Sequence, residues 1–208
     1  MTSIDSYAFE NCSSLTSINI PESVEHFQYD AIVGCYSLTS ITVDSNNQVY
    51  DSRNNCNAII ETNSNKLISG CKTTTIPDSV TSIGDFAFNR YSSLTSITIP
   101  DSVTSIGTFA FDYCGSENNP LQITFESETP ISLYNGGILY AFGNKNEHPL
   151  YLEIIVPSGY ENTYATHDSG WEEYAEFIIN PNISIFYYAD GGETTSEDAE
   201  ITSNSYDN

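Results

Sequence analysis

Basic residues are scarce in this 208-residue sequence: five Lys and Arg stand against 28 Asp and Glu, which gives a formal net charge of −23 at pH 7. Nucleic-acid affinity depends mainly on Lys and Arg side chains that neutralise phosphates. The deficit therefore predicts that neither nucleic acid nor an anionic membrane is a partner of this protein.

Long apolar runs are also missing, because no stretch approaches the roughly 18 to 20 consecutive apolar residues of a membrane-spanning helix,. The first residues, "MTSIDSYAFENCSSL", contain neither the basic nor the apolar region of a secretory signal,. These absences predict no membrane span. They leave two alternatives for location: a cytoplasmic protein, or a sequence that begins inside a longer gene.

Cysteines are few and odd in number, five in all, which argues against a closed disulfide framework,. No pair has the CxxC spacing of a metal site. Three fall at one position of the repeat described below and are interpreted as buried packing residues: Cys12, Cys35 and Cys114. Cys56 and Cys71 flank a predicted hairpin, and a disulfide between them stays open at this point.

What the chain does contain is a repeat of 23 residues that aligns without gaps over residues 1–23, 24–46 and 80–102, with a fourth copy opening at Val103. Segments such as "LTSITIP" alternate β-branched residues with Ser, Thr or Asn, which predicts half-buried strands that end at Pro. The "AF" segment is expected to form a short helical turn with Ala and Phe inward. The period lies within the range of about 20 to 29 for leucine-rich repeats.

Residues 47–79 interrupt the array and contain three strand candidates, "QVYDS", "NAIIET" and "KLISG". Ala58–Thr62 and Lys66–Ser69 flank "NSN", which predicts a hairpin. Residues 115–179 form degenerate coils and a C-terminal cap, with Ala141 and Phe142 in the Ala-Phe position. In "YLEIIVP", at residues 151–157, the side chains predicted to point inward are Tyr151, Ile154 and Val156.

The single tryptophan, Trp171, is followed by Tyr174 and Phe177 at helical spacing. This cluster either caps the open apolar end of the last coil or forms a separate aromatic ligand site. Residues 180–208 are expected to add one last strand, "ISIFYYA", and then a disordered acidic tail.

The repeat "LTSITIPDSVTSIGDFAFNRYSS" closely resembles the BspA-type leucine-rich repeat family, strongly over residues 1–46 and 80–114. The insert, and the closing "LEIIVPSGYENTYATHDSGWEEYAEFI", also resemble segments of family members, so that the resemblance reaches about residue 180. It implies a curved solenoid, usually exposed at the cell surface or secreted. It also implies a role in adhesion and protein binding rather than catalysis.

Catalytic and metal-binding patterns are missing from the sequence. His26, His148 and His167 lie in different contexts without HExxH, a GxSxG elbow or a paired Cys,. The acidic stretch "ADGGETTSEDAE" lacks the alternating Asp ligands of a calcium loop. We therefore expect no catalytic residues, no bound metal and no cofactor, and interpret the protein as not an enzyme.

A polar surface remains as the candidate binding site. Outward residues of stacked strands would lie about 4.8 Å apart and form a ladder of small polar groups: Ser17, Asn19, Ser40, Thr42, Ser96 and Thr98. These residues either simply suit an exposed sheet or form a rigid face that docks a partner.

The prediction is thus a β-rich α/β solenoid: a leucine-rich-repeat array of about 23-residue coils over residues 1–179, with a hairpin-bearing insert at 47–79 and a C-terminal capping segment. Its predicted function is non-catalytic binding of a protein or glycan, with host extracellular matrix as one candidate partner. The protein is expected to be a monomer that is exposed at the cell surface or secreted. The alternative is an intracellular scaffold for protein–protein interaction.

Overall fold

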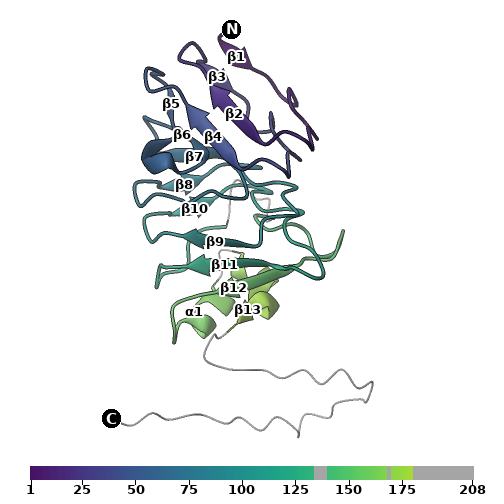
Figure 1. The fold of residues 1–208 in the computed structure, drawn as a ribbon. Helices are drawn as coiled ribbons and strands as arrows, with labels where there is room; N and C mark the ends of the chain where they lie inside the picture. The colour runs from purple at the N-terminus through teal and green to yellow at the C-terminus, as the bar shows by residue number, and fades with distance from the viewer. Residues whose placement is uncertain (134–139, 168–169, 180–208) are drawn as a thin grey trace, which may run out of the picture.

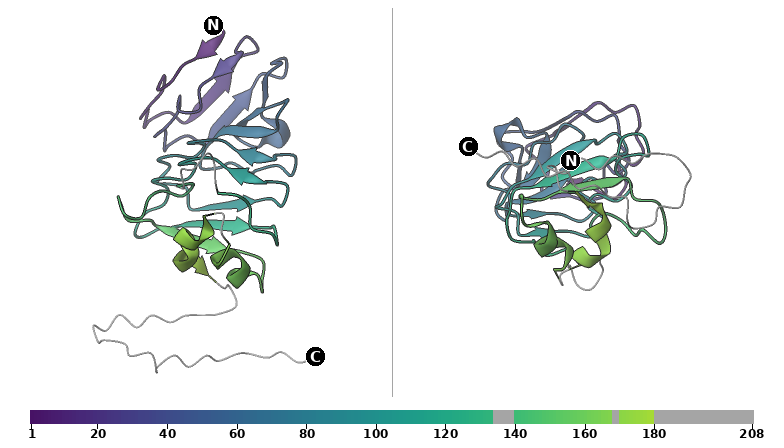
Figure 2. Two further views of the ribbon diagram at one scale, coloured as in Figure 1. Left: turned by 180° about the vertical axis from the view of Figure 1, so that it is seen from behind. Right: turned by 90° about the horizontal axis from the view of Figure 1, so that it is seen from below.

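The structure, a computed structural model, describes residues 1–133, 140–167 and 170–179. The last strand and acidic tail expected at 180–208 lie outside the described residues. Successive coils stack along one axis, from the N-terminal end at the top of Figure 1 to the C-terminal helices at the bottom. Figure 2 (right) looks along this axis, where the coils lie nearly one behind another.

The described elements are mostly short strands, with few helices. In chain order they are β1 Ser3–Ile4, β2 Ser17–Ile20, β3 His26–Phe27, β4 Ser40–Val43, β5 Tyr50–Asp51, η1 Arg53–Asn55, β6 Ala58–Glu61, β7 Lys66–Gly70, β8 Ser82–Ile83, β9 Ser96–Ile99, β10 Ser105–Ile106, β11 Leu121–Phe125, β12 Leu152–Ile155, α1 Glu161–Ala165, η2 Trp171–Phe177 and β13 Ile178–Ile179.

Parallel strand pairs join successive coils, and in the regular coils the paired residues are one repeat apart. The predicted strands are confirmed as β2, β4 and β9, and Ser17 pairs with Ser40, 23 residues later. A second row consists of two-residue strands, in which Ser82 pairs with Ser105. Sequence reasoning missed this second row, because two residues are too few to show alternation.

The "AF" segments are turns, so the prediction of a short helical turn is wrong. Phe86 and Phe109 adopt left-handed φ values of 55° and 54°, which bend the chain away from a helical path,. In place of helical bonds, the Phe88 amide donates to the Ala110 carbonyl of the next coil at 2.7 Å. These corners are thus a third ladder between coils.

Ala and Phe do point inward, as predicted, in the interior coils. Ala87, Ala110 and Phe88 are fully buried, and the rings of Phe88 and Phe111 stack at 5.0 Å. In the first coil Ala8 is exposed and Phe9 only half-buried. A coil buries its inner side chains between two neighbours, and the described structure gives the first coil only one.

The insert contains the predicted hairpin, since β5, β6 and β7 are antiparallel neighbours. The hairpin rejoins the solenoid where β7 pairs in parallel with β8. Gly70 takes the corner position, and its amide donates to the Ala87 carbonyl at 2.9 Å. A Cβ at Gly70 would collide with the Phe88 ring, so a side chain there would displace the core.

Asn47 fastens the insert to the preceding coil. It occupies the position of Val24, Val80 and Val103 in the repeat and is buried. Its Nδ2 donates to the carbonyls of Pro21 at 2.8 Å and Val24 at 2.9 Å, while its Oδ1 accepts from the amides of the two residues that lead into β5. Because both polar atoms of this side-chain amide are hydrogen-bonded, its burial costs little free energy. The same bonds fix the path of the chain from the preceding coil into β5.

The C-terminal aromatic cluster packs on the last coils. Trp171 is fully buried and donates from Nε1 to the Ile131 carbonyl at 2.8 Å. The Tyr174 hydroxyl donates to the Gly143 carbonyl at 3.0 Å. Trp171 thus packs against the last coils with its ring buried and its N–H bonded, which favours the predicted cap over a separate ligand site.

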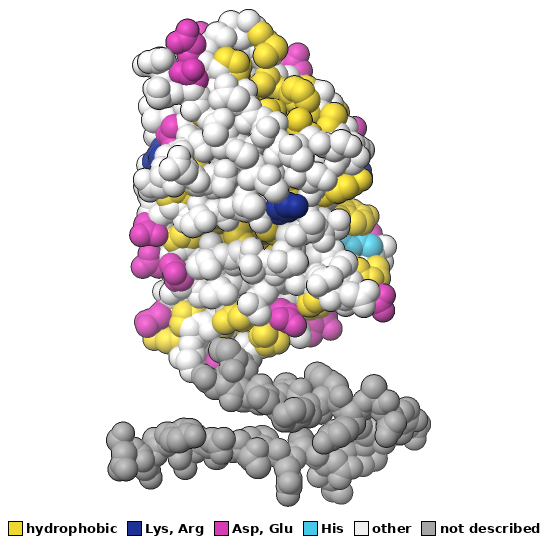
Figure 3. Space-filling view, viewed as in Figure 1, with side chains coloured by type: hydrophobic (Ala, Val, Ile, Leu, Met, Phe, Trp, Pro, Cys, Tyr) yellow, Lys and Arg dark blue, Asp and Glu magenta, His cyan; other side chains and the backbone are white. Residues whose placement is uncertain are grey.

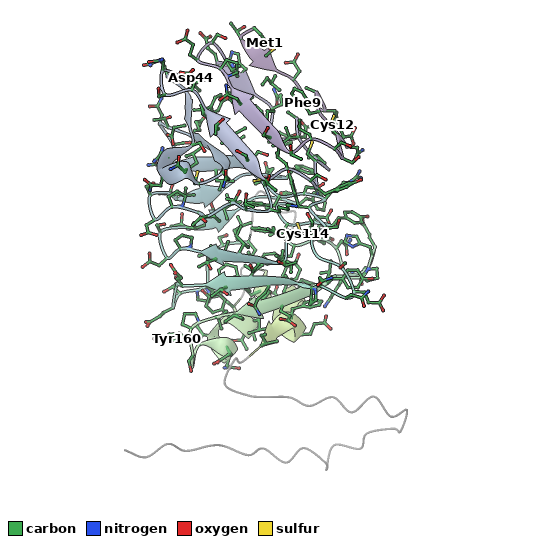
Figure 4. The ribbon with its side chains drawn as sticks, viewed as in Figure 1. Met1, Phe9, Cys12, Asp44, Cys114 and Tyr160 are labelled. Atoms are coloured by element: carbon green, nitrogen blue, oxygen red, sulfur yellow. The ribbon has the colours of Figure 1, made fainter. Side chains whose placement is uncertain are left out.

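The cysteines follow the packing interpretation with one exception, Cys12, which is exposed. Cys35 donates from Sγ to the Phe9 carbonyl of the preceding coil, and Cys114 does the same to Phe88. The first coil has no such neighbour in the described structure, so the burial predicted for Cys12 is wrong (Figure 4). Cys56 and Cys71 are buried and free, so no disulfide joins them.

Replacing Phe88 by Ala should lower the free energy of unfolding by roughly 3 to 5 kcal/mol, because the cavity would lie in the stacked core. Replacing Thr98 by Ala should cost less than about 0.5 kcal/mol, because its side chain is exposed,. Urea denaturation measures both. Equal losses would show that the inward and outward faces are wrongly assigned.

Iodoacetamide should modify one cysteine of the native protein, Cys12, and all five after denaturation. Burial raises the pKa of the Cys35 thiol to about 11 and also raises that of Cys114, which leaves little reactive thiolate at neutral pH,. Mass spectrometry counts the adducts, and rapid native labelling of Cys35 or Cys114 would contradict this packing.

Candidate binding surface

The outward positions of β2 and β4 form the first part of the predicted surface. Ser17 pairs with Ser40 and Asn19 with Thr42 across the parallel ladder. Ser40 is half-buried and the other three are exposed. The Thr42 hydroxyl donates to Asn19 Oδ1 at 2.9 Å, so neighbouring coils also bond through these side chains.

Ser96 and Thr98 lie on a different sheet. Strand β9 pairs with β11, which places Ser96 beside Gln122 and Thr98 beside Thr124. We call the outward residues of β2, β4, β9 and β11 the strand face: Ser17, Asn19, Ser40, Thr42, Ser96, Thr98, Gln122 and Thr124. The expected single continuous ladder is therefore interrupted.

The insert causes this interruption. Residues 73–76 occupy the strand position of their coil, yet they form no strand. The Thr75 amide donates to the Cys56 carbonyl, within the insert, at 3.1 Å. Only the Thr73 hydroxyl reaches the preceding coil, where it donates to the Thr39 carbonyl at 2.6 Å. The hairpin thus diverts backbone bonds that a regular coil would use for stacking.

The eight residues of the strand face are uncharged, although the chain as a whole is strongly acidic. An acid borders them on the next strand of the same sheet, where Glu153 of β12 pairs with Gln122 and accepts from its Nε2 at 3.4 Å. Figure 3 shows this side as mostly uncharged, with one basic side chain near its middle and acidic side chains along its edge and at its lower end. Acidic residues follow the strands or the corresponding insert segment in five successive coils: Glu22, Asp44, Asp78, Asp101 and Glu126. The acids thus gather at turns, where short polar side chains suit the backbone.

A pocket of about 550 Å³ lies at the opposite ends of the coils, where the corner turns lead into the strands. We call it the corner pocket. Its walls include Tyr36, Arg90, Tyr113 and His148, from four different coils. Its volume falls within the range of about 300 to 1,000 Å³ found for small-ligand sites.

Tyr113 and His148 form one rigid wall of this pocket. Their rings stack with centroids 4.0 Å apart, and the Arg90 guanidinium lies 5.8 Å from the Tyr113 centroid. His148 Nε2 lies 2.8 Å from Asp112 Oδ1, which fixes the imidazole from behind. Burial raises the pKa of the Asp112 carboxyl, while the contact with His148 opposes that rise.

The described residues offer no group of three or more His, Cys, Asp or Glu side chains arranged to hold a metal ion. His26 is exposed on β3, whereas His148 is held by its carboxylate partner. Over residues 1–133, 140–167 and 170–179, no helix has the length and apolar content needed to cross a membrane.

Sequence reasoning missed the corner pocket. Two of its five aromatic residues come from positions next to the buried cysteines, Tyr36 after Cys35 and Tyr113 before Cys114. The recurring Cys with an adjacent Tyr was the available signal. The order of the two residues is reversed between the copies, and only the folded turns bring both rings to one place.

Comparison with known families gives a match to the BspA type leucine rich repeat region, in six copies, over residues 1–69 and 58–135. No curated protein matches this chain.

Solved structures of bacterial repeat proteins are also similar. A leucine rich cell surface protein from Faecalibacterium prausnitzii is 28% identical with a TM-score of 0.47, covering 68% of this chain and 42% of its own. A leucine-rich repeat protein from Eubacterium ventriosum is 25% identical with a TM-score of 0.48, covering 75% and 46%. The pneumococcal vaccine antigen PcpA is 14% identical with a TM-score of 0.42, covering 79% and 54%. The match thus spans less than half of the first two proteins.

Proposed function

Because this chain belongs to the BspA-type leucine-rich repeat family, we propose that it is a non-catalytic adhesion module that binds a host protein or glycan through its strand face. Members of this family are generally not enzymes and are usually exposed at the cell surface or secreted, which supports an extracellular role. The proposed partner is a component of the extracellular matrix or a mucin-type glycoprotein, bound by a monomer.

The run of uncharged outward residues on β2, β4, β9 and β11, which ends at Glu153 of β12, carries this proposal. In a chain with a net charge of −23, an acidic residue at any of the eight outward positions would repel acidic matrix components and require desolvation on docking,. Ser, Thr, Asn and Gln side chains offer hydrogen-bond donors and acceptors without that cost. The face therefore suits a partner rich in hydroxyl and amide groups.

Rigidity supports the same function. Each strand of the face bonds to a neighbouring coil, and the hydroxyl side chains are short. Binding consequently orders few flexible groups, and the entropy lost on association is small compared with that of a loop-based site.

Thr98→Glu should test the face directly. It adds a charge at an exposed position of β9 and should weaken binding to an immobilised panel of matrix proteins, mucins and glycans by about tenfold or more,. Gln28→Glu, exposed on the turn after β3, adds the same charge outside the face and should change binding less than about twofold.

Surface plasmon resonance measures these affinities, with circular dichroism melts confirming that both variants fold. If the unmodified protein bound no member of the panel above background, the adhesive function would be wrong. If Thr98→Glu and Gln28→Glu weakened binding equally, the strand face would not be the site.

A further inference from the structure

We propose that the corner pocket binds a sugar that carries a carboxylate, with Arg90 as its charge partner and Tyr36 as its stacking platform. This inference goes beyond the proposed function, because the pocket lies in the corner turns rather than at the outward positions of the strands.

Charge selects the ligand class. Among the described residues, no Asp or Glu lines the corner pocket, whereas Arg90 does. His148 also lines it, but its Nε2 is already paired with Asp112 at 2.8 Å. Elsewhere in the described chain, Arg53 pairs with Asp51 at 2.6 Å and Lys145 with Glu176 at 3.0 Å. No carboxylate of the described residues lies within ion-pair distance of Arg90. An anion can therefore approach Arg90 without contacting an Asp or Glu side chain of the described pocket lining.

The Arg90 guanidinium suits a carboxylate in particular. Its planar array of N–H donors matches the two carboxylate oxygens, and such bidentate pairs are stronger than neutral hydrogen bonds. Arg90 is exposed and its guanidinium carbon lies 5.8 Å from the Tyr113 centroid, so its N–H donors stay accessible beside that ring,.

The aromatic walls point to a sugar as the carrier of that carboxylate. The C–H groups on one face of a pyranose carry partial positive charge and pack against the electron-rich face of a tyrosine ring. Tyr36 is 44% exposed and lines the pocket, so part of its ring is accessible to such stacking.

Neutral polar groups complete the site. Ser92 and Asn11 line the same pocket and are exposed, so that their hydroxyl and amide groups can bond sugar hydroxyls,. The stack of His148 on Tyr113, anchored by Asp112, keeps the opposite wall fixed before a ligand arrives. An acidic peptide would use Arg90 equally well, but it would leave these neutral groups without a matching row of hydroxyls.

Saturation-transfer NMR and calorimetric titration of the full chain test the proposal. The probes are the methyl glycosides of glucuronic acid, galacturonic acid and N-acetylneuraminic acid, with those of glucose and galactose as uncharged counterparts and N-acetylaspartate as the peptide-like acid. At least one acidic sugar should bind about tenfold more tightly than the uncharged sugars and more tightly than N-acetylaspartate.

Two variants assign the roles. Arg90→Gln should remove the preference for the acidic sugar, and Tyr36→Ala should weaken all sugars by about tenfold while keeping that preference. Lys72→Gln and Tyr29→Ala make matched changes at exposed residues outside the pocket and should leave binding within about twofold. Thr98→Glu should also leave it unchanged, which separates this site from the strand face.

The proposal is overturned if no acidic sugar binds, if charged and uncharged sugars bind equally, if N-acetylaspartate binds best, or if Arg90→Gln retains the preference. Circular dichroism melts establish that each variant keeps its fold, so that a loss of binding reports on the pocket.

Discussion

Every part of this structure depends on hydrogen bonding and packing between coils 23 residues apart. A coil of 23 residues would lose roughly 1.5 kcal/mol per residue of conformational freedom on ordering, and its own inner side chains cannot offset that loss. Stacking supplies the difference, because the regular interior coils bury their inner side chains against both neighbours and share backbone hydrogen bonds along the strand rows and the corner turns. Ala8 and Cys12 are exposed because the first coil has a neighbouring coil on one side only in the described structure.

The surfaces available for binding follow from this constraint. Inner positions must be apolar for packing, and acidic residues lie mainly in the turns. Residues that could bind a partner are therefore found at outward strand positions and at the corners. The strand face consists of small or uncharged polar residues on two sheets, whereas the corner pocket combines residues from four coils. A repeat thus offers two kinds of candidate binding site: a ladder of similar groups, and a composite cavity in which each coil contributes a different side chain.

Sequence periodicity predicted the solenoid, the strands β2, β4 and β9, and the hairpin of the insert, because alternation and turn residues are local signals. It could not predict the left-handed turns at Phe86 and Phe109, since aromatic residues rarely adopt positive φ and do so here only because inter-coil bonds hold them,. The interruption of the strand face could not be predicted from the sequence either. It depends on Thr75 bonding to Cys56 instead of the adjacent coil, and the corner pocket likewise depends on contacts between distant turns.

Deletion of residues 80–102 tests the central claim most directly. It joins Ser79 to Val103 and preserves the repeated "PDSVTSIG" junction, so that the coil after the insert stacks in place of the one removed. If the stacking interface is the unit of stability, the shortened chain will fold with a cooperative thermal transition at a lower midpoint and a β-rich circular dichroism spectrum. A deletion of 80–90, which breaks the register, should abolish that transition. An in-register deletion that leaves the chain as unfolded as the out-of-register one would contradict the account.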